Sequence, residues 1–295
     1  MPMSISQINI THFSDKYNSL FNSCTYEDGL FAEVMDQLNQ SMCDDDNRVV
    51  YEPRDISDAI KCLKNSKQDG VYSLMTDNFI HAPTCLSDHL CMFYNSCIRH
   101  GLVPKDMLMS TMVPIPKDVS KNECISDNYH AIALCVLVLK IFEYCVLNSN
   151  RDKLRASSLQ FAYKPEHSTS QCTWVSKEIV SYYNNNGSDV YGCLLDCSKA
   201  FDKIRYDVLC DKLIAKGLPL SIVRIIMYMY LNGNAQVRWD GHTSNAFPVN
   251  NGVKQGSVIS PLLFTLYVDE LVDQLRESGF GCKLGVKYVG IQIIC

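Results

Sequence analysis

The sequence predicts an α+β fold, because helical and strand-like segments follow one another without a regular β-α-β rhythm. A long apolar run over 131–147, broken by Lys140 and Glu143, is typical of a core helix. A short apolar run bounded by turn residues, such as 190–196, is typical of a buried strand. With 295 residues, 47% of them hydrophobic, the chain can bury the core of one large domain or of two smaller ones.

Capping residues and helical periodicity predict the helices. Asp55 or Ser57 begins a short helix, and Gly101 ends the helix predicted over 76–101. The remaining helices are predicted over 10–42 with weak patterning, over 131–147, after Ser168 or Thr169, between Asp207 and Gly217, after Ser221, and from Ser260-Pro261 to Gly279. The apolar face of the last helix is predicted to consist of Leu263, Tyr267, Leu271 and Leu275.

Five segments are predicted to form strands. The segment 110–117 is expected at a sheet edge or at an exit into a loop, because its prolines cannot donate hydrogen bonds to a neighbouring strand. The run 190–196 is expected to be a buried strand that ends at Asp196. Asp240-Gly241 between two strand-like runs indicates a β-hairpin, and a last strand is expected within 285–294.

Charge and cysteine content limit the functional classes. Residues 1–60 carry 11 Asp or Glu against 3 Lys or Arg, within a formal net charge of −5 for the chain. This acidic lead-in predicts a solvated linker or tail, and the mildly basic remainder permits nucleic acid as a partner without requiring it. The 15 cysteines include no Cys-x-x-Cys pair, and the N-terminus has no secretory pattern, so we expect buried free thiols. The apolar runs are too interrupted for a membrane span.

Asp196 is the most informative charged residue, because a carboxylate at the end of a buried strand is costly unless a positive group compensates it. Lys199, a helix N-terminus and a metal ion could each be that partner, and the residues alone leave the choice open. Phe201 is consistent with a core aromatic, and Asp202 with a local cap or an ion-pair partner.

The stretch 252–264 places Gln255-Gly256 shortly before Ser260-Pro261. Ser260 and Pro261 are fully explained as the start of a helix. A plain turn explains Gln255-Gly256 less well, since glycine permits a close backbone approach and glutamine offers a donor and an acceptor without charge.

Five segments in this order resemble the reverse transcriptases of non-LTR (LINE-type) retrotransposons, over roughly residues 55–290. They are 113–117 (VPIPK), 126–134 (SDNYHAIAL), 159–169 (LQFAYKPEHST), 194–202 (LLDCSKAFD) and 251–271 (NGVKQGSVISPLLFTLYVDEL). The resemblance implies a right-hand polymerase with fingers and palm. It also implies an RNA template, a DNA primer, dNTP and Mg²⁺ as partners.

The resemblance also implies roles for single residues. Asp196 matches the carboxylate that binds both catalytic magnesium ions, with the carbonyl of Cys197 as a further metal ligand. Phe201 matches the steric gate that selects dNTP over rNTP. Gln255 and Gly256 match the loop beneath the incoming base and the templating strand.

Two lysines lie in segments that resemble the fingers. Lys117 and Lys164 could each bind the triphosphate as a point charge. His130 stands where the family usually has arginine, and a neutral histidine cannot make the bidentate phosphate contact of arginine.

A second carboxylate pair, on a Tyr-x-Asp-Asp hairpin, is implied by the resemblance and would begin near Ile294. These 295 residues contain neither this pair nor a thumb, so we expect incomplete fingers and palm without processive polymerase activity. The run 267–270 (YVDE) is not a substitute, because it lies on the helix that Ser260 begins. Asp269 and Glu270 are expected on the solvated face of that helix.

The expected domains are an acidic helical lead-in over 1–50, fingers and the start of the palm over 51–189, and palm over 190–295. The alternative is a non-catalytic nucleic-acid or protein-binding module that keeps the palm as a scaffold. A metal-dependent phosphodiesterase around Asp196 is a weaker alternative, because no cluster of carboxylates or histidines accompanies that residue. Nuclear activity is implied by the family, although no import signal is visible.

Overall fold

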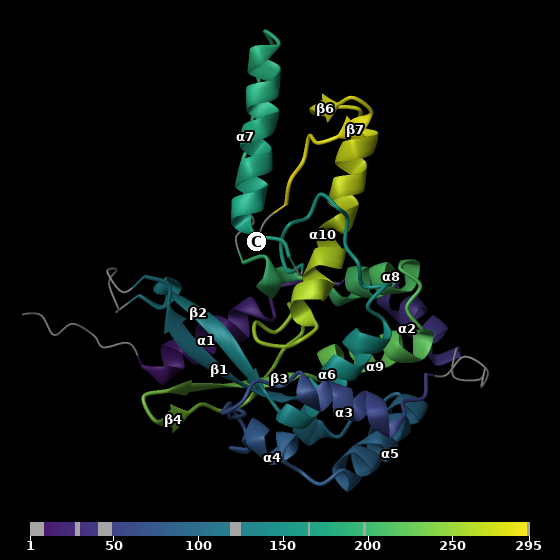
Figure 1. Cartoon of the computed structure of the whole chain (residues 1–295). Coiled ribbons are helices and arrows are strands. Elements are labelled where there is room, and N and C mark those ends of the chain that lie inside the picture. The colour runs from purple at the N-terminus through teal and green to yellow at the C-terminus, as the bar shows by residue number, and fades with distance from the viewer. Residues whose placement is uncertain are drawn as a thin grey trace, which may run out of the picture. The chain divides into compact units, whose positions relative to one another are not determined.

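The computed structural model describes residues 9–26, 30–40, 49–118, 125–164, 166–196 and 199–293. The chain divides into two compact units, Met1–Lys153 with Ala200–Ser260 and Leu154–Lys199 with Pro261–Cys295. The described residues form ten α-helices and seven strands, labelled in Figure 1 where there is room. The predicted mixture of helices and strands is therefore confirmed.

The first unit contains most of the helices and a five-stranded sheet. Its helices are α1 (Ile10–Leu20), α2 (Leu30–Gln40), α3 (Pro53–Lys61), α4 (Thr76–Ile80), α5 (Cys85–His100), α6 (Leu137–Ser149), α8 (Tyr206–Ala215) and α9 (Leu220–Leu231). Its strands are β1 (Met109–Pro116), β2 (Tyr129–Cys135), β3 (Asn234–Trp239), β4 (His242–Thr243) and β5 (Phe247–Pro248). Short 3₁₀ helices are η3 (Lys105–Met107), η4 (Ser126–Asn128) and η5 (Phe201–Lys203).

Strand β1 lies inside the sheet, in the order β2-β1-β3-β4, so of the two predicted alternatives for 110–117 the sheet edge is wrong, while the strand does end at Pro116 and leave the sheet there. Its parallel pairing with β3 ends at Met112, whereas its antiparallel pairing with β2 continues to Pro116. The backbone nitrogens of Pro114 and Pro116 point to the same edge of β1 as that of Met112. Beyond Met112, β3 no longer pairs along this edge. The missing N–H groups of the two prolines leave no ladder bond unmade, which explains how an inner strand tolerates them.

The predicted helix over 131–147 is wrong in its first third. Residues 129–135 form β2, and α6 begins only at Leu137. In β2 the buried Tyr129, Ala133 and Cys135 alternate with more exposed neighbours, as in a strand with one core face. The continuous apolar run hides this change of period from two to 3.6.

Helix α1 supplies aromatic residues to the core of the first unit, and Figure 1 shows it beside the sheet. The cluster consists of Phe13, Tyr17, Phe21, Met112, Tyr129, Ala235, Val237, Phe247 and Val249. The Phe13 ring meets Tyr129 edge-on at 5.0 Å between centroids and lies 4.7 Å from Trp239. This stretch of the acidic lead-in is therefore core, while the acidic run 43–47 falls outside the described residues.

Helix starts predicted from single polar residues are wrong by a few positions. Helix α3 begins at Pro53, and Asp55 reaches back to accept the Glu52 N–H at 2.8 Å. Asp207 lies in the first turn of α8, and α9 begins before Ser221. The helix predicted over 76–101 is two helices, α4 and α5. The predicted cap at Ser168, the hairpin at Asp240-Gly241 and the glycine turns at Gly101, Gly217 and Gly279 are confirmed.

The second unit contains α7 (Thr169–Asn185), α10 (Ser260–Glu277), β6 (Lys283–Leu284) and β7 (Lys287–Tyr288). The Tyr183 hydroxyl joins α7 to β6, since it donates to the Lys283 carbonyl at 2.7 Å and accepts the Lys283 N–H at 2.9 Å. The predicted last strand is limited to the short hairpin and an isolated bridge between Gln160 and Ile293.

Helix α10 begins at Ser260 as predicted, but its predicted faces are partly wrong. Leu271 and Leu275 are exposed, and the buried apolar residues are Leu263, Phe264, Leu266 and Val272. Asp269 is buried because its carboxylate accepts the Ser157 N–H at 2.8 Å and the Gln160 side-chain amide at 2.7 Å. Glu270 is exposed, as predicted.

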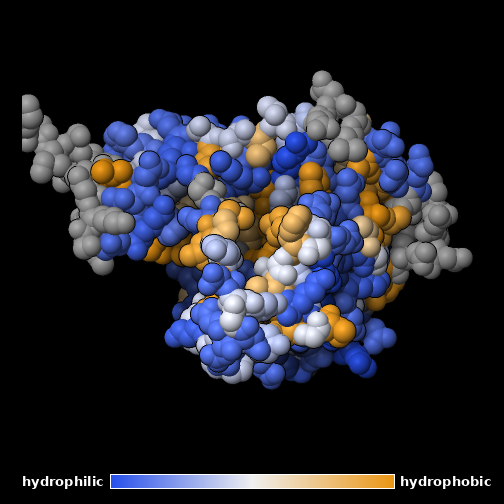
Figure 2. All heavy atoms as spheres, turned by 90° about the horizontal axis from the view of Figure 1, so that it is seen from above, coloured by the Kyte–Doolittle hydropathy of each residue, from blue (hydrophilic) through white to orange (hydrophobic). Residues whose placement is uncertain are grey.

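The predicted buried strand over 190–196 is wrong, because this segment has no regular secondary structure and residues 191–196 are exposed. No strand among the described residues pairs with it. A strand needs a partner for its N–H and C=O groups, and an apolar run alone does not reveal one. Tyr191, Leu194 and Leu195 are therefore among the exposed large hydrophobics. On the face drawn in Figure 2, hydrophobic side chains likewise reach the surface among mainly hydrophilic ones.

The described cysteines are all free, as predicted. Their predicted burial holds for Cys91, Cys97, Cys135, Cys145, Cys172 and Cys210, whereas Cys62, Cys85 and Cys193 are exposed. Among the described helices, none combines the length and apolarity of a membrane span.

Candidate functional site

The end of the 194–202 motif, at Phe201 and Asp202, meets the start of the 252–264 motif in the first unit. The Val253 N–H donates to the Phe201 carbonyl at 2.8 Å, and the Gly252 N–H donates to the Ile204 carbonyl at 2.8 Å. Gly252 has φ +85°, and a Cβ on it would lie 2.7 Å from the Asp202 carbonyl oxygen. The 3₁₀ turn η5 and the start of the Gln255-Gly256 loop are thus in direct backbone contact, although about fifty residues separate them in sequence.

Strand β2 supports the Gln255-Gly256 pair. The Ala133 N–H donates to the Gln255 carbonyl at 2.7 Å. Gly256 has φ +129°, and a Cβ there would lie 2.3 Å from the Ala133 carbonyl oxygen. Protein packing alone therefore requires glycine at 256, independently of any ligand. Gly256 itself is exposed and the Gln255 side chain is partly exposed, so the outer side of the pair is open.

Glu143 holds the other end of this loop. The residue is 2% exposed, and its carboxylate accepts the Ser257 hydroxyl at 2.7 Å and the Val258 N–H at 2.8 Å. Burial raises the pKa of Glu143, against the lowering effect of these two hydrogen bonds and of Lys254 and Lys140. The motifs in the sequence did not indicate Glu143 as part of the site, although a carboxylate inside an apolar helix was an available signal.

Asn251 joins the loop to the N-terminal segment. Its side-chain amide donates to the carbonyls of Asp202 at 2.6 Å and Leu20 at 3.0 Å, and its side-chain oxygen accepts the Cys24 N–H at 3.2 Å. The side chain is fully buried and uses all of these contacts within the protein. No pattern in the sequence indicated this role.

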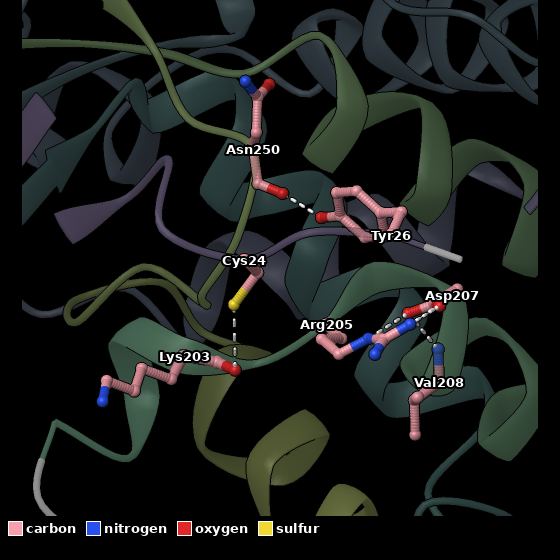
Figure 3. A network of polar contacts seen from close by, with 7 residues as sticks. All are labelled: Cys24, Tyr26, Lys203, Arg205, Asp207, Val208 and Asn250. Atoms are coloured by element: carbon pink, nitrogen blue, oxygen red, sulfur yellow. Dashed lines mark hydrogen bonds and ion pairs between the residues drawn. The ribbon is translucent and has the colours of Figure 1, made fainter. Parts of the chain in front are cut away.

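Figure 3 shows the neighbouring contacts between the N-terminal segment and the two motifs. The Tyr26 hydroxyl donates to the Asn250 carbonyl, and the Cys24 thiol lies 3.7 Å from the Lys203 carbonyl oxygen. Residues 20–26 therefore contact both the end of η5 and the residues just before the loop.

The same close-up contains a buried carboxylate (Figure 3). Asp207 accepts from the Arg205 guanidinium at 2.5 Å and from the Val208 N–H at 2.8 Å. Burial alone would raise the pKa of Asp207, but the Arg205 and backbone hydrogen bonds bring it below its usual value. The pair fixes the segment that follows η5.

Lys117 and His130 lie together at one end of the β1-β2 pair, where Ile115 is opposite His130. Both side chains are exposed. The pKa of His130 is lowered, first by partial burial and then by the positive charges of Lys117 and Lys16. This end of the sheet therefore exposes the positive charge of Lys117 beside His130, while Lys16 forms an ion pair with Asp127.

Lys164 belongs to the second unit and has contacts within it. Its ammonium group donates to the Ser157 carbonyl, and its pKa is lowered by partial burial, against the raising effect of Asp269. Lys164 thus takes part in the polar network around Ser157 and Asp269.

Asp196 is exposed and lies in the second unit, and among the described residues no ion pair joins it to Lys199. Cys197 falls outside the described residues. In the part of the chain that the structure describes, no group of three or more His, Cys, Asp or Glu side chains could hold a metal ion. Asp196 offers one carboxylate, which does not by itself fit a two-ion magnesium site.

These features define the class of protein. It is a mixed α/β protein in which a glycine-containing loop and a Phe-Asp turn are joined by backbone hydrogen bonds into one site. The family model of reverse transcriptase (RNA-dependent DNA polymerase) matches residues 115–293, which include both motifs. The chain belongs to the reverse transcriptase family.

Curated relatives from Drosophila melanogaster agree with this assignment. A retrovirus-related Pol polyprotein from a type-2 retrotransposable element is 25% identical over 185 residues, 63% of this chain and 17% of that protein. A probable RNA-directed DNA polymerase from transposon X-element is 26% identical over 245 residues, 81% of this chain and 26% of that protein. The RNA-directed DNA polymerase from mobile element jockey is 26% identical over 187 residues, 62% of this chain and 20% of that protein.

The predicted resemblance to retrotransposon reverse transcriptases is therefore confirmed. The chain spans between 17% and 26% of the length of these three relatives.

Proposed function

We propose that this chain supplies the nucleotide- and template-contacting part of an RNA-directed DNA polymerase. One observation carries the proposal: the turn that contains Phe201 and the loop that contains Gln255-Gly256 are hydrogen-bonded to each other through Val253. In a polymerase of this family, both motifs must reach the same nucleotide, so they must be neighbours. Phe201 would then exclude the 2′-hydroxyl of an rNTP, and the open side of the loop would face the base and the template.

The basic end of the β1-β2 pair is the proposed phosphate contact. Lys117 is exposed there beside His130, whose pKa is lowered, so lysine would carry the positive charge. Lys164 remains a proposed second contact, although its hydrogen bond to Ser157 competes with that role. Asp196, with the carbonyl of Cys197, remains the proposed magnesium ligand, and Mg²⁺ would supply charge neutralisation at the triphosphate.

Within this proposal the first unit would include the fingers and part of the palm. The boundaries expected from the sequence would assign 1–50 to the lead-in, 51–189 to the fingers and the start of the palm, and 190–295 to the palm. What supports the palm assignment is the contact between η5 and the 252–256 loop.

Nucleic-acid binding tests the proposal. The chain of 295 residues is titrated into a fluorescent DNA primer annealed to RNA, with anisotropy as the readout. Lys117→Ala is expected to weaken binding and to reduce the slope of log affinity against log salt by about one. Lys64→Ala, at an exposed lysine after α3, is the matched control and should leave both values unchanged. Equal effects of the two variants would contradict the phosphate contact.

Nucleotide selection tests the gate. A fluorescent dNTP bound to the complex of protein, primer and template is displaced by unlabelled dNTP or rNTP. Phe201→Val should bring the two displacement curves together, whereas Phe280→Val, at an exposed phenylalanine of the second unit, should leave them apart. If Phe201→Val still discriminated dNTP from rNTP as the wild type does, Phe201 would not be the steric gate.

A further inference from the structure

We propose that Glu143 is the positioning residue of the loop over 255–258, an inference that rests on the proposed function of that loop. Both carboxylate oxygens of Glu143 are used, one by the Ser257 hydroxyl at 2.7 Å and the other by the Val258 N–H at 2.8 Å. These are the two residues directly after Gly256. The carboxylate therefore determines the direction in which the chain leaves the glycine.

Strand β2 fixes the loop on the other side of the glycine. The Ala133 N–H holds the Gln255 carbonyl at 2.7 Å, and the Ala133 carbonyl occupies the space that a side chain on Gly256 would need. The loop is thus held immediately before and immediately after position 256. Its peptide planes have little freedom left, because each neighbour of the glycine has a separate anchor.

The two anchors belong to one piece of the fold. Strand β2 ends at Cys135 and α6 begins at Leu137, so a single residue, Val136, separates the elements that carry Ala133 and Glu143. Val136 is buried, and α6 is largely buried along its length. The strand and the helix therefore present Ala133 and Glu143 as one rigid support beneath the loop.

The charge of Glu143 is not what the loop requires. Burial disfavours the ionised carboxylate, and the charged groups that face it are Lys254, beside the loop, and Lys140, one turn back on α6. A glutamine in the same place can accept the Val258 N–H and donate to the Ser257 hydroxyl, which can act as donor or acceptor. Geometry predicts that Glu143→Gln keeps the loop in place and that Glu143→Ala does not.

The test compares four variants of the whole chain: Glu143→Ala, Glu143→Gln, Ser257→Ala and Asp69→Ala. Asp69 is the matched control, since it is also a buried carboxylate that accepts backbone N–H groups, at Val71 and Tyr72 in another loop of the same unit. The readouts are amide hydrogen exchange of peptides over 255–260, affinity for the RNA–DNA primer-template and thermal stability.

Glu143→Ala is expected to accelerate exchange over 255–260 by at least about tenfold and to weaken primer-template binding by a similar factor, because two buried hydrogen bonds that hold the loop are lost. Glu143→Gln should restore both to within about threefold, and Ser257→Ala should fall between them. Asp69→Ala should lower thermal stability without changing either readout. If Glu143→Ala does not fold, the comparison of Ser257→Ala with Glu143→Gln decides.

Equal exchange over 255–260 in Glu143→Ala and Asp69→Ala would overturn the proposal. A Glu143→Gln variant that exchanges and binds like Glu143→Ala would also overturn it. Failure of the wild-type chain to bind the primer-template would instead overturn the proposed function. The exchange measurement would still decide whether Glu143 positions the loop.

Discussion

Replacing Gly256 by alanine tests most directly why the Gln255-Gly256 pair exists. At φ +129° a residue with a side chain is strained, at a cost of about 1–3 kcal/mol. The added Cβ would also lie 2.3 Å from the Ala133 carbonyl oxygen, and such overpacking costs about 1–3 kcal/mol more. Gly256→Ala should therefore destabilise the first unit by about 2–6 kcal/mol, the sum of the two terms.

Urea unfolding followed by tryptophan fluorescence measures this effect. Trp239 of β3 packs on Phe13 at 4.7 Å between ring centroids and reports on the first unit, and Trp174→Phe removes the exposed tryptophan of the second. At a urea slope of about 2 kcal/mol per molar, the midpoint should fall by about 1–3 M. Gly217→Ala, also at positive φ but with nothing within 4 Å of the added Cβ, is the control and should cost only about 1–2 kcal/mol.

An equal midpoint shift in the two glycine variants would refute the packing argument. The result would matter for function, because a glycine needed only for nucleotide approach predicts reduced binding and no loss of stability beyond the backbone strain. A glycine needed for the contact with β2 predicts loss of stability first.

Three further predictions concern the surroundings of the loop. Lys117→Met should raise the pKa of His130, because Lys117 has the larger effect of the two lysine charges that lower it. Proton NMR of the imidazole measures this pKa, and an unchanged titration would contradict the closeness of Lys117 to His130. Asp207→Asn should destabilise the first unit at neutral pH. Since the folded pKa of Asp207 is lowered, its contribution is complete above the unfolded value of about 3.9 and is lost as pH falls through the folded value, so melting temperatures of wild type and variant should converge on acidification. Asn251→Ala should cost about 2–4 kcal/mol in urea unfolding, because three buried hydrogen bonds disappear; a loss below about 1 kcal/mol would show that water replaces them.

Features set by a few adjacent residues could be predicted from the sequence. The cap at Ser168 and the hairpin at Asp240-Gly241 depend on local backbone chemistry, and both are present. The motif order was enough to identify the reverse transcriptase family. Features that depend on a distant partner were predicted poorly. The run 190–196 has the composition of a strand, but a strand forms only where another strand accepts its hydrogen bonds.

The helix predicted over the apolar run 131–147 was partly wrong for a related reason. Its first part becomes β2 because β1 offers a full antiparallel edge over Ser110–Pro116, and this pairing overrides the helical preference of the stretch. The consequence reaches the site, because the strand places Ala133 under Gly256 and the following helix places Glu143 under Ser257. A helix over the whole run would have offered neither support.

The structural and the functional reasons for Gly256 are compatible, because they concern opposite sides of the same peptide. The inner side is filled by the Ala133 carbonyl, which excludes any side chain and holds the backbone close to β2. The outer side is exposed, and there the chain presents bare backbone next to the partly exposed Gln255. Packing against β2 thus leaves main chain exposed on the outer side, with one uncharged hydrogen-bonding side chain beside it, which is what the proposed contact with a base or a template strand requires. Because the inner side requires glycine at 256, the outer side, where the ligand is proposed, carries no side chain at this position.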